Sequence, residues 1–212
     1  MEKVLEVNNL VATFTINKKE YEVLRDISFS INKNETLCVV GESGCGKSVT
    51  TLCIMDLLPN NGRVVSGSIS LNGTDLTKLS KKERNSYRGK KMGMIFQEPM
   101  TALNPLLTIG YQLCENIMLH RGLDKKEAKK LAVEYLEKVG IAQAESRLKQ
   151  YPFQLSGGLR QRVLIAMVLS AQPDLLIADE PTTALDVTIQ KQVLTLLNDL
   201  KKEMSAGDRK SV

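Results

Sequence analysis

The sequence predicts an α/β protein, and three observations lead to this fold class. Residues 1–40 alternate between apolar and polar side chains, as β-strands do. Residues 99–150 carry apolar side chains at helical spacing. The segments TLCVV (36–40) and DLLIADEP (174–181) contain apolar runs without polar alternation, which is typical of strands buried on both faces of a parallel sheet. We therefore expect an N-terminal antiparallel β-subdomain, a parallel core and an inserted helical subdomain.

The composition is that of an ordinary globular chain. Its 212 residues are 42% apolar and 25% charged, which predicts a single domain over 1–212 and excludes a disordered or fibrous chain. The net charge is +5 and the pI is near 9.0. The lysines lie in short clusters such as Lys81–Lys82, Lys90–Lys91 and Lys125–Lys126, without interleaved aromatic residues. Such clusters are more typical of a solvated surface than of a nucleic-acid interface, so we expect no nucleic-acid partner.

The cysteines and the hydropathy pattern bear on the compartment. Cys38, Cys45, Cys53 and Cys114 show no C-x-x-C spacing and no nearby histidine, which predicts neither a metal site nor a disulfide framework. Unpaired cysteines of this kind fit a reducing compartment. The N-terminal segment is charged and alternating, and no apolar run reaches membrane-spanning length. We expect a soluble, cytosolic protein whose contact with a membrane comes through a partner.

The individual elements follow from these patterns. Strands are predicted at 4–16, 21–31, 36–40, 67–73 and 90–97. A helical subdomain is predicted at roughly 99–160, before the final apolar strand at 174–181.

The helical subdomain contains its own start and stop signals. Asp124 and Glu127 form a capping-box pair, and Gly140 supplies a stop. The apolar face between them contains Ala128, Leu131, Ala132, Tyr135, Leu136 and Val139. A second helical run follows Ser156.

The motif GESGCGKS at 41–48 matches G-x-x-x-x-G-K-S, follows an apolar segment and opens a helical stretch, as the motif requires. Its glycines let the backbone curl so that N–H groups surround phosphates. Lys47 would reach the β- and γ-phosphates, and the Ser48 hydroxyl would complete a Mg²⁺ shell. Cys45 is interpreted as a small loop residue rather than a redox switch, because nothing in the sequence identifies a resolving thiol. We call 41–48 the phosphate loop.

Two acids follow the last apolar run. Asp179 lies at the C-terminal end of this predicted strand, where ligands collect in open parallel sheets, and could hold the metal from the other side. Glu180 comes next and could polarise an attacking water. Adjacent acids alone would indicate a solvated strand end, but their combination with the phosphate loop favours a catalytic role.

A second anion site is predicted in QLSGGLRQRVLIA (154–166). Ser156 is expected to begin a helix there, and the exposed N–H groups of such a start attract anions. Gly157 and Gly158 leave the backbone unobstructed, although a Gly-Gly pair also suits a plain loop.

The motifs in this order resemble the ATP-binding cassette ATPases: GESGCGKS, Gln97 in MIFQEP, LSGGLRQR, DLLIADEP and TALD (183–186). The resemblance covers residues 3–203, and QEPMTALNP, YPFQLSGG and ADEPTTALDVTIQ further resemble the ATP-binding subunits of dipeptide, oligopeptide and nickel importers. It implies a P-loop NTPase with a RecA-like core that uses ATP and Mg²⁺ to energise an importer for peptides or a nickel-like metal.

The resemblance also implies partners. In this family two cassettes associate head to tail, so that the second anion site would serve the γ-phosphate of ATP held by the other cassette. Two integral membrane permease subunits and, indirectly, a substrate-binding protein would complete the assembly at the cytoplasmic face of the cell membrane.

The resemblance assigns roles residue by residue. Glu180 and Gln97 would be catalytic, and Ser48, Gln97 and Asp179 would hold the metal. Nucleotide contacts are assigned to Gly41, Glu42, Ser43, Gly44, Cys45, Gly46, Lys47, Ser48, Val49, Ser156, Gly157, Gly158, Gln161 and Asp186. Adenine usually stacks on an aromatic ahead of the phosphate loop; Phe14 is the first choice and Tyr21 the alternative, and either could equally pack within the β-subdomain.

The chain departs from the family pattern after about Glu203, because MSAGDRKSV lacks the apolar strand and the following histidine that the family places there. We expect a cassette without its usual C-terminal strand and region, through truncation or a shifted reading frame, and with impaired hydrolysis. Two other interpretations are a poorly active fragment and a soluble cassette ATPase of DNA maintenance. The latter usually inserts a long coiled coil between the phosphate loop and LSGG, and no sustained heptads occur in this interval.

Overall fold

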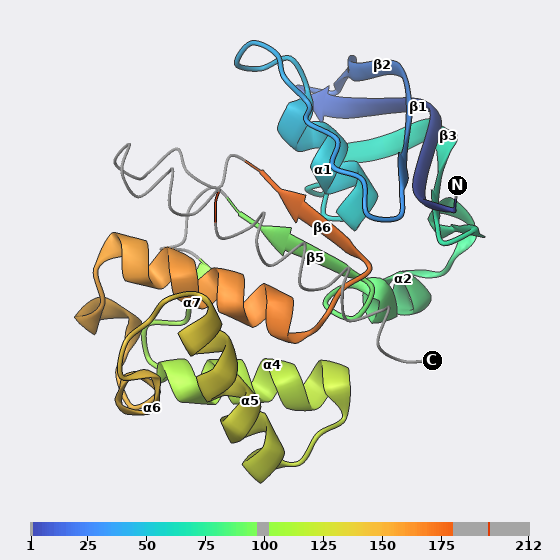
Figure 1. Cartoon of the computed structure of the whole chain (residues 1–212). Helices are drawn as coiled ribbons and strands as arrows, with labels where there is room; N and C mark the ends of the chain where they lie inside the picture. The colour runs from blue at the N-terminus through green and yellow to red at the C-terminus, as the bar shows by residue number, and fades with distance from the viewer. Residues whose placement is uncertain (1, 97–101, 180–194, 196–212) are drawn as a thin grey trace. The chain divides into compact units, whose positions relative to one another are not determined.

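A computed structural model of the 212-residue chain describes residues 2–96, 102–179 and 195 (Figure 1). The chain divides into two compact units, residues 1–88 and residues 89–212, which we call the first and the second unit.

The first unit is built on a four-stranded antiparallel sheet in the order β2-β1-β3-β4. Apolar side chains of β1 at alternate positions, including Leu5 and Val7, are buried on one face. The β1–β2 hairpin turns at Asn17 and Lys18, whose φ angles of 51° and 63° suit the tight turn that matches strand twist. The predicted antiparallel β-subdomain is thus confirmed. Its strands are β1 (Lys3–Ile16), β2 (Lys19–Asn32), β3 (Gly62–Leu71) and β4 (Thr74–Asp75).

Aligned irregularities cross this sheet and bend it. The register of β1 shifts near Asn9 against both β2 and β3. The Asn9 backbone N–H donates to Ser28 Oγ at 2.8 Å, and its side-chain amide donates to Asp26 Oδ1 at 2.6 Å. Gly67 on β3 has φ +92°, and a Cβ there would lie 2.5 Å from the Asn9 carbonyl oxygen. Only glycine fits this close backbone approach. The aligned bulges near Asn9, together with Gly67, therefore form a row that fixes the strand register.

The prediction of a buried strand at 36–40 is wrong. The structure places this segment outside any strand, and the side chains of Leu37, Val39 and Val40 are exposed to 40%, 56% and 83%. A strand buried on both faces needs a neighbouring strand for its backbone hydrogen bonds, and among the described strands none pairs with 36–40. The apolar composition of 36–40 led to the prediction of burial, but composition does not indicate whether a neighbouring strand is present to pair with the segment.

Short helices complete the first unit. The first of them, α1 (Lys47–Met55), follows the phosphate loop and buries Cys53, Ile54 and Met55 near its C-terminus. The others are η1 (Leu76–Lys78) and α2 (Lys81–Tyr87).

The second unit combines a parallel strand pair with a group of helices. Strand β5 (Met92–Ile95) pairs in parallel with β6 (Leu175–Ala178), as the sequence predicted for the core. Helix α7 (Gly157–Ser170) contacts β5 as well as α4 (Ile109–Arg121) and α5 (Lys125–Lys138). The apolar residues between them form the core of this unit. The remaining elements are α6 (Ala144–Arg147) and η2 (Pro152–Gln154).

The local signals in the helical region are confirmed. Asp124 and Glu127 form the predicted capping box at the start of α5, with the Glu127 N–H donating to Asp124 Oδ1 at 2.8 Å. Gly140 follows the helix with φ +76°, the left-handed conformation that ends helices. The predicted apolar face is buried, with Leu131 partly exposed but packed against the core.

Candidate phosphate-binding site

The phosphate loop curls back on itself before α1 begins. The Cys45 N–H donates to the Glu42 carbonyl at 3.3 Å, and the Thr50 N–H donates to the Gly46 carbonyl at 2.9 Å in the first helical turn. Gly44 and Gly46 have φ angles of +81° and +101°. A Cβ at Gly46 would lie 2.8 Å from Leu24 Cδ2. Glycine is therefore required at Gly46 by the backbone conformation and by the buried Leu24 beside it.

The Lys47 side chain lies across this loop. Its Nζ donates to the carbonyl oxygens of Gly41 and Glu42, both at 2.8 Å, and lies 3.8 Å from Cys45 Sγ. The ammonium thus lies beside the curled backbone and the start of α1. A cation, a curled loop and a helix N-terminus are features that suit a phosphate group, so phosphate binding here stays a prediction.

The neighbouring residues of the motif are accessible. Glu42, Ser43 and Ser48 are exposed, and Val49 is partly exposed in the first turn of α1. The Ser48 hydroxyl oxygen, next to Lys47, belongs to the class of hard ligands that Mg²⁺ prefers. No group of three histidine, cysteine or acidic side chains capable of holding a metal occurs in the part of the chain that the structure describes.

The two candidate aromatic residues face one another across the β1–β2 hairpin. Phe14 pairs with Tyr21 in β2 and with Gly62 in β3. The Phe14 ring lies over Gly62, where an added Cβ would meet ring atoms at 3.0 to 3.4 Å. Tyr21 is 50% exposed. The structure thus gives Phe14 a packing contact, and stacking of adenine on either ring stays a prediction.

The second predicted anion site is a helix start, as expected. Ser156 is the N-cap of α7, and its Oγ accepts a hydrogen bond from the Leu159 N–H at 3.4 Å. An added Cβ on Gly157 would meet no atom within 4 Å, so the backbone there is open. Gln161, one turn further on, is only 1% exposed and lies inside the second unit. The first turn of α7 is therefore accessible to a ligand at Ser156 and Gly157.

Two contacts that sequence analysis did not assign hold α7 in place. The Arg162 guanidinium donates to the Val139 carbonyl at the end of α5 at 2.5 Å, and Asn116 of α4 donates to the Met167 carbonyl at 2.8 Å. Gly140 gives Arg162 room, because a Cβ there would lie 2.7 Å from its Nη1. Sequence reasoning did not identify these two contacts, since each joins helices that are far apart in the chain.

Asp179 lies where the sequence placed it, directly after β6. Its N–H donates to the Ile95 carbonyl at 3.0 Å, so it extends the parallel pair at the carboxyl ends of both strands. Ligands gather at such ends in parallel sheets. The phosphate loop belongs to the first unit, whereas Asp179 and Ser156 belong to the second. The predicted residues Gln97, Glu180 and Asp186 lie outside the described residues.

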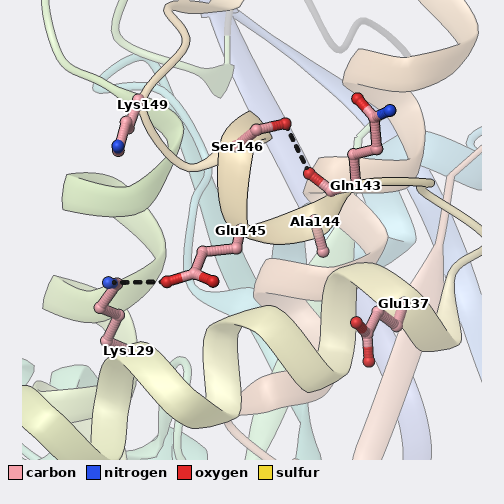
Figure 2. A pocket seen from close by; sticks show the side chains of 7 residues that line it. All are labelled: Lys129, Glu137, Gln143, Ala144, Glu145, Ser146 and Lys149. Atoms are coloured by element: carbon pink, nitrogen blue, oxygen red, sulfur yellow. Dashed lines mark hydrogen bonds and ion pairs between the residues drawn. The ribbon is translucent and has the colours of Figure 1, made fainter.

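A surface depression of about 470 Å³ lies beside α5 and α6 in the second unit (Figure 2). Lys129 and Glu145 form an ion pair across it at 3.2 Å, and the Ser146 hydroxyl donates to the Gln143 carbonyl at 2.8 Å. Its cations and acids offset one another, and none of the predicted site residues lines it. The phosphate loop therefore remains the candidate site.

Among the described residues, no helix is both long enough and apolar enough to cross a membrane.

Several known proteins are similar to this chain in sequence. Residues 24–183 match the family described as ABC transporter. The chain is 52% identical over 208 residues to the oligopeptide transport ATP-binding protein AppD of Bacillus subtilis, a match that covers 98% of this chain and 63% of that protein. It is 49% identical over 204 residues to the oligopeptide transport ATP-binding protein OppD of Salmonella typhimurium, covering 96% of this chain and 61% of that protein. The chain thus spans less than two thirds of the length of these relatives.

The same likeness holds for the fold. A solved dimeric structure of an ATP-binding cassette in a post-hydrolysis state, bound to ADP and Pi, has a TM-score of 0.82 and 28% identity, covering 94% of this chain and 83% of that chain. The predicted α/β P-loop NTPase fold with an N-terminal antiparallel β-subdomain is thus confirmed.

Proposed function

Because this chain belongs to the ABC transporter family, we propose that it is the ATP-binding and ATP-hydrolysing subunit of an importer for peptides. The observation that carries this proposal is the phosphate loop, in which Lys47 Nζ lies 2.8 Å from two loop carbonyls at the start of α1. Peptides are favoured over nickel as cargo because relatives at about half identity are named for oligopeptide or dipeptide transport.

ATP binding is assigned first to the phosphate loop. Backbone N–H groups of 41–49 would surround the phosphates, and Lys47 would leave the loop carbonyls to place its charge on the β- and γ-phosphates. Phe14, or alternatively Tyr21, would stack against adenine. Ser48, Asp179 and Gln97 would hold Mg²⁺ with oxygen ligands, which that ion prefers. When bound, Mg²⁺ would neutralise negative charge on the phosphates.

Hydrolysis is assigned to the end of the β6 strand. Glu180 would accept a proton from the attacking water, and Gln97 would orient that water. A carboxylate suits this role because it is ionised at neutral pH and can accept a hydrogen bond from water.

Pairing of two cassettes is assigned to the start of α7. Ser156, Gly157 and Gly158 would contact the γ-phosphate held by the second cassette through the hydroxyl and open N–H groups, at the positive end of the helix. Gln161 would act from inside α7, and Asp186 would organise the interface. ATP would then hold the two surfaces together, and loss of the γ-phosphate would release them.

The assembly would include two permease subunits and, indirectly, a substrate-binding protein. In it, this chain would be a peripheral subunit at the cytoplasmic face of the cell membrane.

One substitution tests the enzymatic part of the proposal. Glu180→Gln should retain Mg-ATP binding and abolish phosphate release, because an amide keeps the shape but cannot accept the proton. It should also prolong an ATP-dependent dimer, which size-exclusion chromatography in Mg-ATP measures. Phosphate release by Glu180→Gln at the parental rate would exclude Glu180 as the base.

A second substitution tests the pairing surface. In the Glu180→Gln chain, Ser156→Arg should prevent the ATP-dependent dimer while the monomer still binds Mg-ATP, since the larger side chain fills the space for the γ-phosphate. The matched control is Ser146→Arg, because Ser146 is an exposed serine of α6. The chain with this substitution should dimerise normally. Normal dimerisation of the Ser156→Arg chain would refute the shared site. Co-purification with permease subunits, followed by uptake assays with labelled oligopeptide and with nickel, tests the cargo.

A further inference from the structure

Helix α1 carries the phosphate loop at its N-terminus, and its opposite end is bound by side chains from another helix. The helix is nine residues long, which corresponds to about 13 Å. Its C-terminal residues Cys53, Ile54 and Met55 are buried, whereas its N-terminus joins the accessible loop. The orientation of the loop therefore depends on how this buried end is held.

The C-terminus of α1 has an unfavourable charge distribution of its own. Its last turn contains no basic residue, although the helix dipole concentrates negative charge there. Asp56, the C-cap, adds a carboxylate at the same end with φ +53°. The Leu57 and Asp56 N–H groups bond to the Leu52 and Cys53 carbonyls, but an ideal helix offers no partner to its last carbonyl, that of Met55. A cation from elsewhere would offset this negative charge and could donate a hydrogen bond to the Met55 carbonyl.

Two arginines associated with α2 supply that cation. Arg88 Nη1 donates to the Asp56 carbonyl at 2.9 Å and to the Met55 carbonyl at 3.3 Å. Arg84 Nη1 donates to Asp56 Oδ1 at 2.8 Å, and the side chains of Arg84 and Asp56 are each about one third exposed. Arg84 lies in the last turn of α2, and Arg88 is the C-cap residue that follows the helix.

The arginine pair is itself fixed in position. The Arg88 guanidinium also donates to Asn85 Oδ1 through Nη2, which holds the plane of the group from the other side. Helix α2 begins at a capping box in which Ser80 and Glu83 bond reciprocally. One arginine in α2 and one directly after it thus bind the end of α1.

We propose that Arg84 and Arg88 are positioning residues for the phosphate loop, which hold the C-terminus of α1 so that its N-terminus presents the loop to ATP. This inference rests on the proposed function, because it requires ATP to bind at the phosphate loop. The arginines do not touch the phosphates; they act through α1.

The experiment measures the dissociation constant and the stoichiometry of Mg-ATP binding by the full chain. Arg88→Ala should weaken binding about tenfold, equivalent to about 1.4 kcal/mol, at unchanged stoichiometry. Arg84→Ala should weaken it in the same direction. Arg88→Lys should recover part of the affinity, since one ammonium can still reach the carbonyls. The matched control is Arg25→Ala, because Arg25 is an exposed arginine paired with Glu22 at 3.3 Å, and it should bind as the parent does.

Stoichiometry separates positioning from a general loss of structure. Irreversible unfolding of part of the sample lowers the number of sites and leaves the dissociation constant of the folded chains unchanged. Reversible unfolding raises the apparent constant by the reciprocal of the folded fraction, so circular dichroism at the titration temperature first establishes that each variant is folded. A parental dissociation constant in Arg84→Ala and Arg88→Ala, with or without fewer sites, would overturn the inference. If neither alanine variant folds, Arg88→Lys decides: a raised dissociation constant supports the inference and a parental value overturns it. Failure of the parental chain to bind Mg-ATP would refute the proposed function itself.

Discussion

Replacing Gly46 by alanine should weaken Mg-ATP binding more than replacing Gly44, because the two glycines differ in their surroundings. Gly46 has φ +101°, and a non-glycine residue in such a conformation costs about 1–3 kcal/mol. The added Cβ would also lie 2.8 Å from Leu24 Cδ2, and displacing that buried side chain from its rotamer costs about 1 kcal/mol. The two terms together are about 2–4 kcal/mol, which corresponds to a loss of affinity of roughly 30-fold to several hundredfold.

Gly44→Ala is the matched control in the same loop. Gly44 has φ +81°, but an added Cβ would meet nothing within 4 Å. Only the backbone cost of about 1–2 kcal/mol applies, so affinity should fall by roughly five- to thirtyfold. Titration of both variants with a fluorescent ATP analogue and Mg²⁺ measures the difference. Equal affinities, or weaker binding by Gly44→Ala, would refute the argument that contact with Leu24 shapes the loop.

Three further predictions concern stability. Gly67→Ala should lower the free energy of unfolding in urea by about 2–4 kcal/mol, because its Cβ would overlap the Asn9 carbonyl in a left-handed conformation; a loss below about 1 kcal/mol would contradict the row of aligned bulges. Lys18→Gly should raise the melting temperature, since φ +63° favours glycine at the hairpin turn, and a lower value would exclude strain there. Burial and then Lys90 lower the pKa of His120, so the stability that the neutral side chain contributes is present above the usual pKa of 6.5 and is lost as the pH falls below it. His120→Asn should therefore lose less stability than the parent between pH 7.5 and 5.5, and an equal loss would contradict this assignment.

The sequence predicted the features whose signals are local. The capping box of Asp124 and Glu127, the N-cap at Ser156 and the stop at Gly140 all occur as expected, because each depends on residues within one or two turns. The phosphate loop is also local, since the positions of its glycines and of Lys47 are set within eight consecutive residues. Its curled backbone was therefore predictable from the motif.

Features that depend on distant segments were not predictable in the same way. The apolar segment 36–40 has the composition of a buried strand, yet its state depends on a pairing partner that composition does not specify. The arginines that bind the end of α1 lie about thirty residues further along the chain, in a lysine-rich stretch that suggests only a solvated surface. Arg162 ends the LSGGLRQR motif, but the motif does not indicate its contact with the Val139 carbonyl, which lies in another helical segment.

The central claim is that the phosphate loop binds ATP, and calorimetric titration of the parental chain and Lys47→Ala with Mg-ATP tests it most directly. Lys47 is the loop's own cation, and its Nζ lies 2.8 Å from the carbonyls of Gly41 and Glu42. Its removal leaves the N–H groups in place but deletes the charge assigned to the β- and γ-phosphates, so binding should be lost or weakened at least a hundredfold, equivalent to about 2.8 kcal/mol. Saturable binding by the parent and its loss in Lys47→Ala is the predicted result. Equal affinity in the two chains would contradict the account.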